Sequence, residues 1–474
     1  MTSPIPSEEC CSILGHSTID YTKVNEVKNV CEDIENNNTQ DKDKIFNNKD
    51  NVIYYSSNSK GIFAQCLLAG AVLLVATSGG MPIGYSATLL PQLAEENGTM
   101  HADQELGSWI ASVHSLATPI GSLMSGPLLD GIGRRGALQF SAIPLSVGWF
   151  IIGFATNIPC LLVGRVVLGF GVGLMAAPAQ VFLGEMADPK LRGLLTGCTL
   201  TFYCLGIVII YALGASFTWD IVAFCGIIIP TTALIALLLI PESPAWLVRR
   251  KKPDKARKAL LWLRGNNEKQ VEAELEILES RAKLDATRMA NTSLFEKKSS
   301  VISTLLDPSV FKPLTIINIF NFLQLLSGTF IMVFYAVNLV TNIGGDNINS
   351  YLAAVITAII RLVFSILASF LLLRISRRYL GIFSAVGSAL ASFAVAIYIS
   401  IKEDFIDVND AVGVIGVFII FGISSLVEGL FIYIVLPETK NRTLQEIEDY
   451  FQQDNLFWIT RSRKNRKYDI VNKA

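Results

Sequence analysis

Charged residues are scarce in this chain of 474 residues, and their scarcity excludes several classes of protein. Asp, Glu, Lys and Arg make up 17% of the sequence, whereas a soluble globular domain contains about 25%. The net charge of −1 gives no basis for binding nucleic acid. Only three histidines occur, and the eight cysteines have neither metal-ligand spacing nor a disulfide pattern. No nucleophile–base set stands out, so we expect neither an enzyme nor a bound metal or cofactor.

Long apolar runs occupy most of the sequence instead. Hydrophobic residues make up 51% of the chain, in runs about as long as the 20 residues that a membrane-spanning helix needs. The short alternating segments of a membrane barrel do not occur. We therefore predict an all-α membrane protein that crosses the lipid bilayer ten times. The predicted spans are 61–88, 106–129, 137–156, 159–183, 191–215, 218–240, 312–340, 350–373, 379–401 and 411–436.

The distribution of Lys and Arg predicts the orientation of these spans. Basic residues fall on alternate turns, and the opposite turns are acidic. Because short basic turns stay in the cytoplasm, we expect both termini to be cytoplasmic. Asn97 begins an Asn-Gly-Thr sequence in the first outer turn, which predicts a glycosylation site.

Polar segments divide the chain into five regions. Residues 1–60 are rich in Asn, Asp and Lys and predict a disordered cytoplasmic tail. Residues 61–241 and 312–436 form two helical bundles, and residues 437–474 form a second cytoplasmic tail. The charged loop 242–311 contains two stretches with apolar residues at helical spacing, which predict amphipathic helices.

Two sequence patterns occur once in each half of the chain. DGIGRR (130–135) is echoed by LRISRR (373–378), and PESPAWL (241–247) by PETKNRT (437–443). Together with GRVVLGFGVG (164–173), GEMADPKLRG (184–193) and QLLSG (324–328), these motifs resemble in order the signatures of sugar porters of the major facilitator superfamily. The resemblance is greatest to the trehalose transporter-like branch. It implies a major facilitator fold in the plasma membrane that moves a small neutral sugar, trehalose or a hexose, by alternating access.

The resemblance and the inner position of these motifs imply a network of charges at the cytoplasmic ends of the helices. An acid at the end of an apolar helix needs a partner, although basic turns on their own also fix the orientation. The expected gating network consists of Asp130, Arg134, Arg135, Glu185, Arg192 and Glu242 in the first half, and of Arg374, Arg377, Arg378 and Glu438 in the second. The Gly-rich run at residues 169–173 lies within a span, where small residues favour close helix packing over nucleotide binding.

Uncharged polar residues in the seventh span predict the substrate site. Amides and hydroxyls that donate and accept hydrogen bonds suit a sugar, and bonds between helices are the alternative use. Some residues typical of the family are replaced here, by Leu200, Leu325 and Phe330. Arg361, inside the eighth span, should face the cavity or pair with an acid, and Glu428 is the nearest by depth. The expected sugar-binding residues are Asn321, Gln324, Ser327, Asn338 and Arg361, on a face that Asn318 continues.

The first and fourth spans bear on energy coupling. In the proton-driven members of the family that this chain resembles, an acid in the first span pairs with an arginine in the fourth span, near its outer end. Arg165 is present in this chain, but Ser86 stands near the position of the acid, and the run GGMPIGYSATLL contains no Asp or Glu. These residues favour a facilitator that works without a proton gradient.

The second half is shorter than the first. Pro241 lies 111 positions after Asp130, whereas Pro437 lies only 64 positions after Leu373. The shortfall of 47 positions equals about two spans and their turn, so we expect six helices in the first bundle and four in the second, with the family's tenth and eleventh helices missing. An alternative function therefore stands beside transport: a non-transporting sugar-porter relative with a binding or regulatory role, or a shortened splice or gene-model product.

Overall fold

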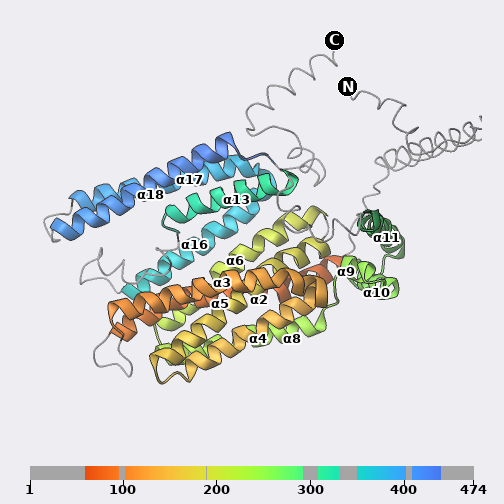
Figure 1. The fold of residues 1–474 in the computed structure, drawn as a ribbon, viewed down its shortest axis with the longest axis horizontal. Coiled ribbons are helices and arrows are strands. Elements are labelled where there is room, and N and C mark those ends of the chain that lie inside the picture. Colours follow the sequence, from red (N-terminus) through yellow and green to blue (C-terminus); the bar gives the residue numbers. More distant parts are fainter. Residues whose placement is uncertain are drawn as a thin grey trace, which may run out of the picture. The chain divides into compact units, whose positions relative to one another are not determined.

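Helices make up all the regular structure that the computed structural model describes, which covers residues 59–94, 102–187, 189–291, 308–329, 333, 350–401 and 408–438 (Figure 1). These residues belong to the unit that spans residues 58–474. The helices of the first half are α2 (Ser59–Ala94), α3 (Gln104–Ile132), α4 (Arg134–Gly153), α5 (Ile158–Met186), α6 (Pro189–Gly214), α7 (Trp219–Gly226) and α8 (Ile228–Leu239). The remaining helices are α9 (Pro244–Arg249), α10 (Pro253–Leu263), α11 (Glu268–Asn291), α13 (Pro308–Leu326), α16 (Ser350–Arg374), α17 (Arg377–Ile401) and α18 (Val408–Ile434).

Helices occur at all ten predicted spans. Within the described ranges, eight segments are long and apolar enough to cross a membrane, with α7 and α8 together forming one of them. The other two predicted spans correspond to α3, whose apolar residues are interrupted by Ser, Gly and Pro, and to the shorter apolar helix α13. The predicted tail up to residue 58, Asn97 and Asn338 lie outside the described residues.

Two of the predicted spans differ in detail from the helices observed. The span 218–240 is divided at Ile227 into α7 and α8. Pro230 lacks the amide hydrogen that would bond to the carbonyl of Gly226, which accounts for the break. The span 312–340 was predicted as one helix, but α13 ends at Leu326 and is followed by Gly328 in a left-handed conformation, with φ 81°.

The first half is built on close contacts of α5 with its neighbours. Helix α5 packs against α3 and α4, and α2 packs against α6. A Cβ atom at Gly169 would lie 2.1 Å from the carbonyl oxygen of His114, so α3 can approach only because position 169 has no side chain. Tyr85 and Trp149 pack edge to face at 5.1 Å in the buried core. The glycine run therefore serves helix packing, as its place within a span predicts.

The second half meets the first along α6 and α16. The hydroxyls of Thr201 and Ser369 lie 3.1 Å apart across this contact, and the hydroxyl of Tyr211 donates to the carbonyl of Val333 at 2.6 Å. Helix α18 packs against α17 and α13. Only 11% and 17% of the most apolar stretches of α16 and α17 are buried, compared with 67% and 56% for α2 and α5. Helices α16 and α17 are therefore less covered by protein than α2 and α5, whereas α18, at 39%, is as buried as α6 and the α7–α8 span, at 33% each.

The loop between the halves contains three helices, α9, α10 and α11, which lie together beside one end of α2 (Figure 1). As the apolar spacing predicts, Ala256, Leu260 and Leu263 of α10 are buried, and so are Val271 and Leu275 of α11. Leu263 also belongs to the same buried cluster as Leu68 of α2. The helical loop is thus anchored to the first helix of the bundle.

Candidate functional site

The turn between α3 and α4 receives a carboxylate from a residue more than 100 positions away. Oε1 of Glu242 accepts hydrogen bonds from the backbone amides of Arg134 and Arg135, both at 3.0 Å, and Oε2 accepts one from Gly136 at 3.4 Å. These amides form the first turn of α4, where unpaired N–H groups and the helix dipole favour an anion. Gly133 has φ 92°, and a Cβ there would lie 2.4 Å from Oε2 of Glu242. The glycine therefore allows this approach.

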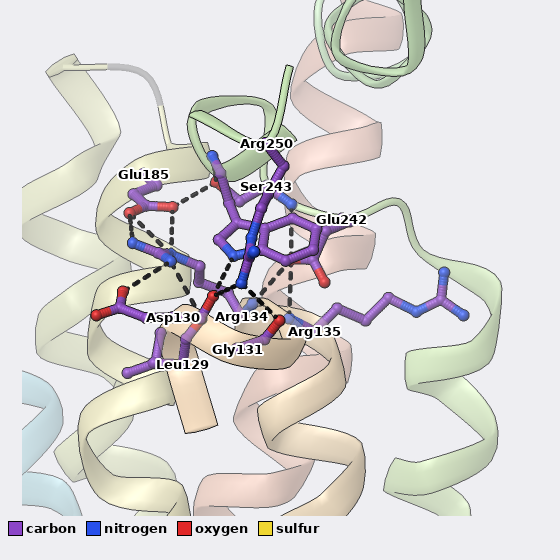
Figure 2. Close-up of polar contacts among 10 residues, drawn as sticks. Leu129, Asp130, Gly131, Arg134, Arg135, Glu185, Glu242, Ser243 and Arg250 are labelled. Atoms are coloured by element: carbon purple, nitrogen blue, oxygen red, sulfur yellow. Dashed lines mark hydrogen bonds and ion pairs between the residues drawn. The ribbon is translucent and has the colours of Figure 1, made fainter. Parts of the chain in front are cut away.

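The side chain of Arg134 is buried directly beside this turn (Figure 2). Its Nε lies 3.0 Å from both carboxylate oxygens of Glu185 at the end of α5, and its Nη2 lies 2.9 Å from Oε1. Nη1 donates to the carbonyl of Leu129 at 3.2 Å. Asp130 lies 3.8 Å from Nη1, but its side chain is 84% exposed. The bidentate pair with Glu185 is therefore the strong ion pair of this turn.

A serine between the two acids connects them. The hydroxyl of Ser243 donates to Oε2 of Glu185, while its backbone amide donates to Oε1 of Glu242 at 2.9 Å. Ser243 is fully buried, and its hydroxyl also caps α9 by accepting from the amide of Trp246. The described ends of α3, α4, α5 and α9 are thus linked by one cluster, which we call the inner cluster: Arg134, Arg135, Glu185, Glu242 and Ser243.

Carbonyl groups at the helix ends around the inner cluster also find donors. Trp246 Nε1 donates to the carbonyl of Asp130 at 3.1 Å, and Arg250 donates to the carbonyls of Asp130 at 2.7 Å and Gly131 at 3.0 Å (Figure 2). Arg135 donates to the carbonyl of Leu238 at 3.2 Å. These contacts occupy carbonyls that have no partner within their own helices. The sequence did not single out Ser243, Trp246 or Arg250. Arg250 directly follows α9, and its guanidinium lies 5.5 Å from the centre of the Trp246 ring.

The second half repeats part of this arrangement. Oε2 of Glu438 accepts from the backbone amide of Arg378 at the start of α17, at 3.3 Å, as Glu242 does at the start of α4. The guanidinium of Arg378 donates to the carbonyl of Tyr433 and lies 5.2 Å from the centre of its ring. Arg374 and Arg377 are exposed at the same turn. The side chain of Arg192 lies outside the described residues.

Arg165 is buried in the first half and is bonded to two neighbouring helices. Its Nη1 donates to the carbonyl of Pro82 in α2 at 2.6 Å, and its Nη2 donates to the hydroxyl of Ser86. Its Nε donates to the carbonyl of Ile110 in α3 at 3.1 Å. Within the described ranges, no carboxylate forms an ion pair with it. Neutral oxygens therefore satisfy this charge.

The polar residues of α13 are spread along an exposed helix. The amide of Asn318 donates to the carbonyl of Leu314 at 2.7 Å, and the hydroxyl of Ser327 donates to the carbonyl of Gln324 at 2.7 Å. Asn321 and Gln324 are exposed. Arg361 belongs to α16, and no hydrogen bond between described residues joins it to Asn321, Gln324 or Ser327. The described contacts thus do not bring all the expected sugar-binding residues together.

Of the two alternatives for Arg361, a place facing the cavity or a pair with an acid such as Glu428, the described contacts do not show the pair. Among the residues that the structure describes, neither side chain forms an ion pair. Helix α16 packs against α6, which places Arg361 near Tyr203 and Tyr211. Glu428 lies on α18, which packs against α13 and α17.

Comparison with known proteins identifies a family and several relatives. The family described as "Sugar (and other) transporter" matches residues 71–409. The facilitated trehalose transporter Tret1 of Anopheles gambiae is 31% identical over 356 residues, which cover 75% of this chain and 44% of that protein. The protein of the same name from Culex quinquefasciatus is 31% identical over 353 residues, or 74% of this chain and 66% of that protein. The chain thus spans less than half of the first relative and about two thirds of the second.

A third relative aligns over nearly its full length. The facilitated trehalose transporter Tret1-2 homolog of Drosophila sechellia is 28% identical over 476 aligned positions, which cover 95% of that protein and 85% of this chain. Since 85% of 474 residues is fewer than 476, this chain has gaps opposite part of that relative.

A solved structure shares the fold. The proton:xylose symporter XylE, a major facilitator protein bound to 6-bromo-6-deoxy-D-glucose, has a TM-score of 0.61 at 19% identity and covers 81% of this chain and 99% of its own.

Proposed function

The chain belongs to the sugar transporter family of the major facilitator superfamily, and from that premise we propose that it is a facilitator that carries trehalose or a hexose across the plasma membrane. Transport proceeds by alternating access and requires no proton gradient. The names of the relatives support trehalose as the first sugar to test. The transported molecule is small and neutral, and no bond is made or broken.

The surroundings of Arg165 carry the proposal of proton-independent transport. A proton-coupled carrier needs a group that gains and loses a proton during the cycle. Here Ser86 and the carbonyls of α2 and α3 occupy the donors of Arg165. A serine hydroxyl and backbone carbonyls do not titrate in the physiological range. The arginine can therefore hold α2, α3 and α5 together without exchanging a proton.

The polar residues of α13 support the proposed recognition of a neutral sugar. Asn321 and Gln324 are exposed and carry amides that can both donate and accept hydrogen bonds. We assign them to the sugar together with Ser327 and Asn338, and we assign Arg361 to the cavity wall. A fixed positive charge suits the hydroxyl oxygens of a sugar, to which a guanidinium donates.

The inner cluster supports a role in the conformational cycle. We assign gating to its residues, with Asp130, Arg192 and, in the second half, Arg374, Arg377, Arg378 and Glu438. The described contacts of Arg134, Glu185 and Glu242 fix the ends of α3, α4, α5 and α9 relative to one another, so the first half can move as a unit. The basic turns place these helix ends, and both termini, in the cytoplasm. Asn97 would then be glycosylated outside.

One observation favours a second candidate function. The low burial of α16 and α17 and the exposed amides of α13 support the idea of a second half without part of its protein surroundings. Polar groups facing hydrocarbon are costly. A chain with this deficit suits a non-transporting relative or a shortened product.

Uptake by the purified chain in liposomes decides between these functions. Radiolabelled trehalose and glucose should enter saturably, at the same rate with and without a pH gradient, and a protonophore should have no effect. Uptake that requires an inward proton gradient would refute facilitation. The absence of uptake for both sugars, with the chain correctly inserted, would favour the second candidate.

A further inference from the structure

The loop that follows the first bundle carries a concentrated positive charge. The ten residues from Arg249 to Lys258 include seven Lys or Arg and a single acid, Asp254. They cover the end of α9 and the first half of α10. The function proposed above uses only Arg250 of this set, because its guanidinium donates to the carbonyls at the end of α3. The other charges need a separate explanation.

Some of this charge is neutralised by α11. Nε of Arg257 lies 2.7 Å from Oε1 of Glu272, and Nε of Arg264 lies 2.9 Å from Oε1 of Glu274. The hydrogen bond to Glu272 raises the pKa of Arg257 above its usual value. In contrast, Lys251, Lys252, Lys255 and Lys258 are exposed and form no ion pair with any residue that the structure describes. Four lysines thus remain available to an external anion.

The arrangement of α10 points these charges to a membrane. Lys255, Lys258 and Trp262 are spaced by three and four residues and therefore share one face of the helix, opposite the buried Ala256 and Leu260. Trp262 is 36% exposed. Tryptophan favours the level of the lipid headgroups, and lysines beside it attract anionic lipids. This combination is typical of helices that lie on a membrane surface.

The position of α10 in the fold keeps this helix close to the ends of the membrane helices. Helix α9 begins at Pro244, five residues after the end of α8 at Leu239. The last residue of α10, Leu263, is buried with Leu68 of α2, the first membrane span. Both ends of the α9–α10 segment are therefore tied to membrane helices near their inner ends.

We propose that Lys251, Lys252, Lys255, Lys258 and Trp262 form a binding surface for the headgroups of anionic phospholipids in the leaflet next to this loop. We call these residues the α10 lipid surface. The inference rests on the inner position of the loop proposed above, but not on sugar transport. Bound lipid would hold α10 against the membrane and, through Leu263 and Arg250, steady the inner ends of α2 and α3.

Native mass spectrometry of the full chain tests this surface. Phosphatidylserine is titrated into the purified protein in detergent, with phosphatidylcholine as the zwitterionic probe. Replacing the four lysines by Gln should weaken the apparent affinity for phosphatidylserine by at least about tenfold, since each lysine near an anionic surface contributes to binding. Replacing the same lysines by Arg is the matched control and should change the affinity by no more than about twofold.

Several results would overturn the inference. Equal affinity for both lipids, or unchanged phosphatidylserine binding in the Gln variant, would show that the lysines recognise no anionic lipid. Displacement of the lipid by soluble glycerophosphoserine at equal concentration would assign the surface to a free anion. The Gln variant should keep the sugar uptake of the parent chain in pure phosphatidylcholine liposomes, so a chain that binds lipid but transports nothing would refute only the proposed function.

Discussion

The guanidinium of Arg134 and the carboxylate of Glu185 meet side-on, with Nε 3.0 Å from both carboxylate oxygens and Nη2 2.9 Å from one of them. The arginine is buried, and the glutamate side chain is 21% exposed. A pair of this kind contributes to stability chiefly because the loss of one partner leaves the other charge buried and uncompensated.

Arg134→Gln or Glu185→Gln should therefore lower the free energy of unfolding by about 3 kcal/mol, the lower end for a buried pair because Glu185 retains some contact with solvent. Sugar flux should also fall, and labelling from the two sides of the membrane should show a carrier shifted toward the inward-open state. Thermal unfolding and accessibility labelling measure the two effects. Asp130→Asn is the control, since its exposed carboxylate should contribute less than about 1 kcal/mol. Labelling identical to that of the parent chain would contradict a gating role.

Gly133→Ala should damage the same cluster through the backbone. The added Cβ would lie 2.4 Å from Oε2 of Glu242, and alanine is strained at φ 92°. The carboxylate would have to move away from the first turn of α4, at a cost of about 1–3 kcal/mol. Gly131→Ala is a matched control, because a Cβ there meets no atom within 4 Å. Equal melting temperatures for the two variants would show that the approach of Glu242 contributes nothing.

The first half of the structure shows what its sequence could predict. The apolar runs predicted the positions of the spans, because hydrophobic length and helix length follow from the same membrane thickness. The motifs predicted that Arg134, Glu185 and Glu242 lie together at helix ends, but they did not predict which atoms meet. Those contacts depend on the φ angle of Gly133, and on Glu242, which lies more than 100 residues later in the chain but contacts the same turn. Ser243 caps α9, and Arg250 follows this helix and donates to two carbonyls at the end of α3. Both roles depend on α9, a helix of only six residues.

The second half was harder to read from the sequence. Helix α13 ends at Leu326, shortly before Gly328 with its left-handed φ angle. The apolar run continues through this glycine, so the run predicted one longer helix. The sequence offered Glu428 as a partner of Arg361 on depth alone, and no ion pair joins the two among the residues that the structure describes. The sequence indicates how deep a residue lies along its span, but it does not indicate which helices pack side by side.

Ser86→Asp should make uptake sensitive to pH. The new carboxylate would stand beside Nη2 of Arg165, which now donates to the serine hydroxyl. The charge of this carboxylate changes when it gains or loses a proton. Initial rates of uptake should therefore vary when they are measured across a range of pH. Ser86→Asn is the control of similar size without a titratable group and should leave the rate independent of pH. A flat profile for the Asp variant would show that position 86 does not act in the transport cycle.

Gln324→Leu should weaken sugar binding by about 1–3 kcal/mol, the scale of one lost hydrogen bond in a buried site. Gln324 is exposed on α13, where its amide can reach a ligand. Equilibrium binding of labelled trehalose and glucose measures the effect. Asn318→Leu is the control, since its amide already donates to the carbonyl of Leu314 in the same helix and should matter less. Unchanged binding in the Gln324 variant would point to a packing role. Better binding of a charged compound than of either sugar would refute a sugar as the substrate.

If the second candidate function holds, two helices inserted between Ile401 and Asp410, taken from a full-length relative, should restore sugar uptake and raise the melting temperature. Rocking of one bundle against the other needs a cavity closed to lipid, and only 11% and 17% of the apolar stretches of α16 and α17 are now buried. Gln324 and Arg361 would gain protein neighbours in place of hydrocarbon. Under that second candidate function, the chain of 474 residues inserts with both termini inside but moves little or no sugar. Two unrelated apolar helices of equal length, inserted at the same place, are the control and should preserve topology without restoring uptake. Robust, saturable and proton-independent uptake by the unaltered chain would show that ten spans suffice and that no helix is missing from the working protein.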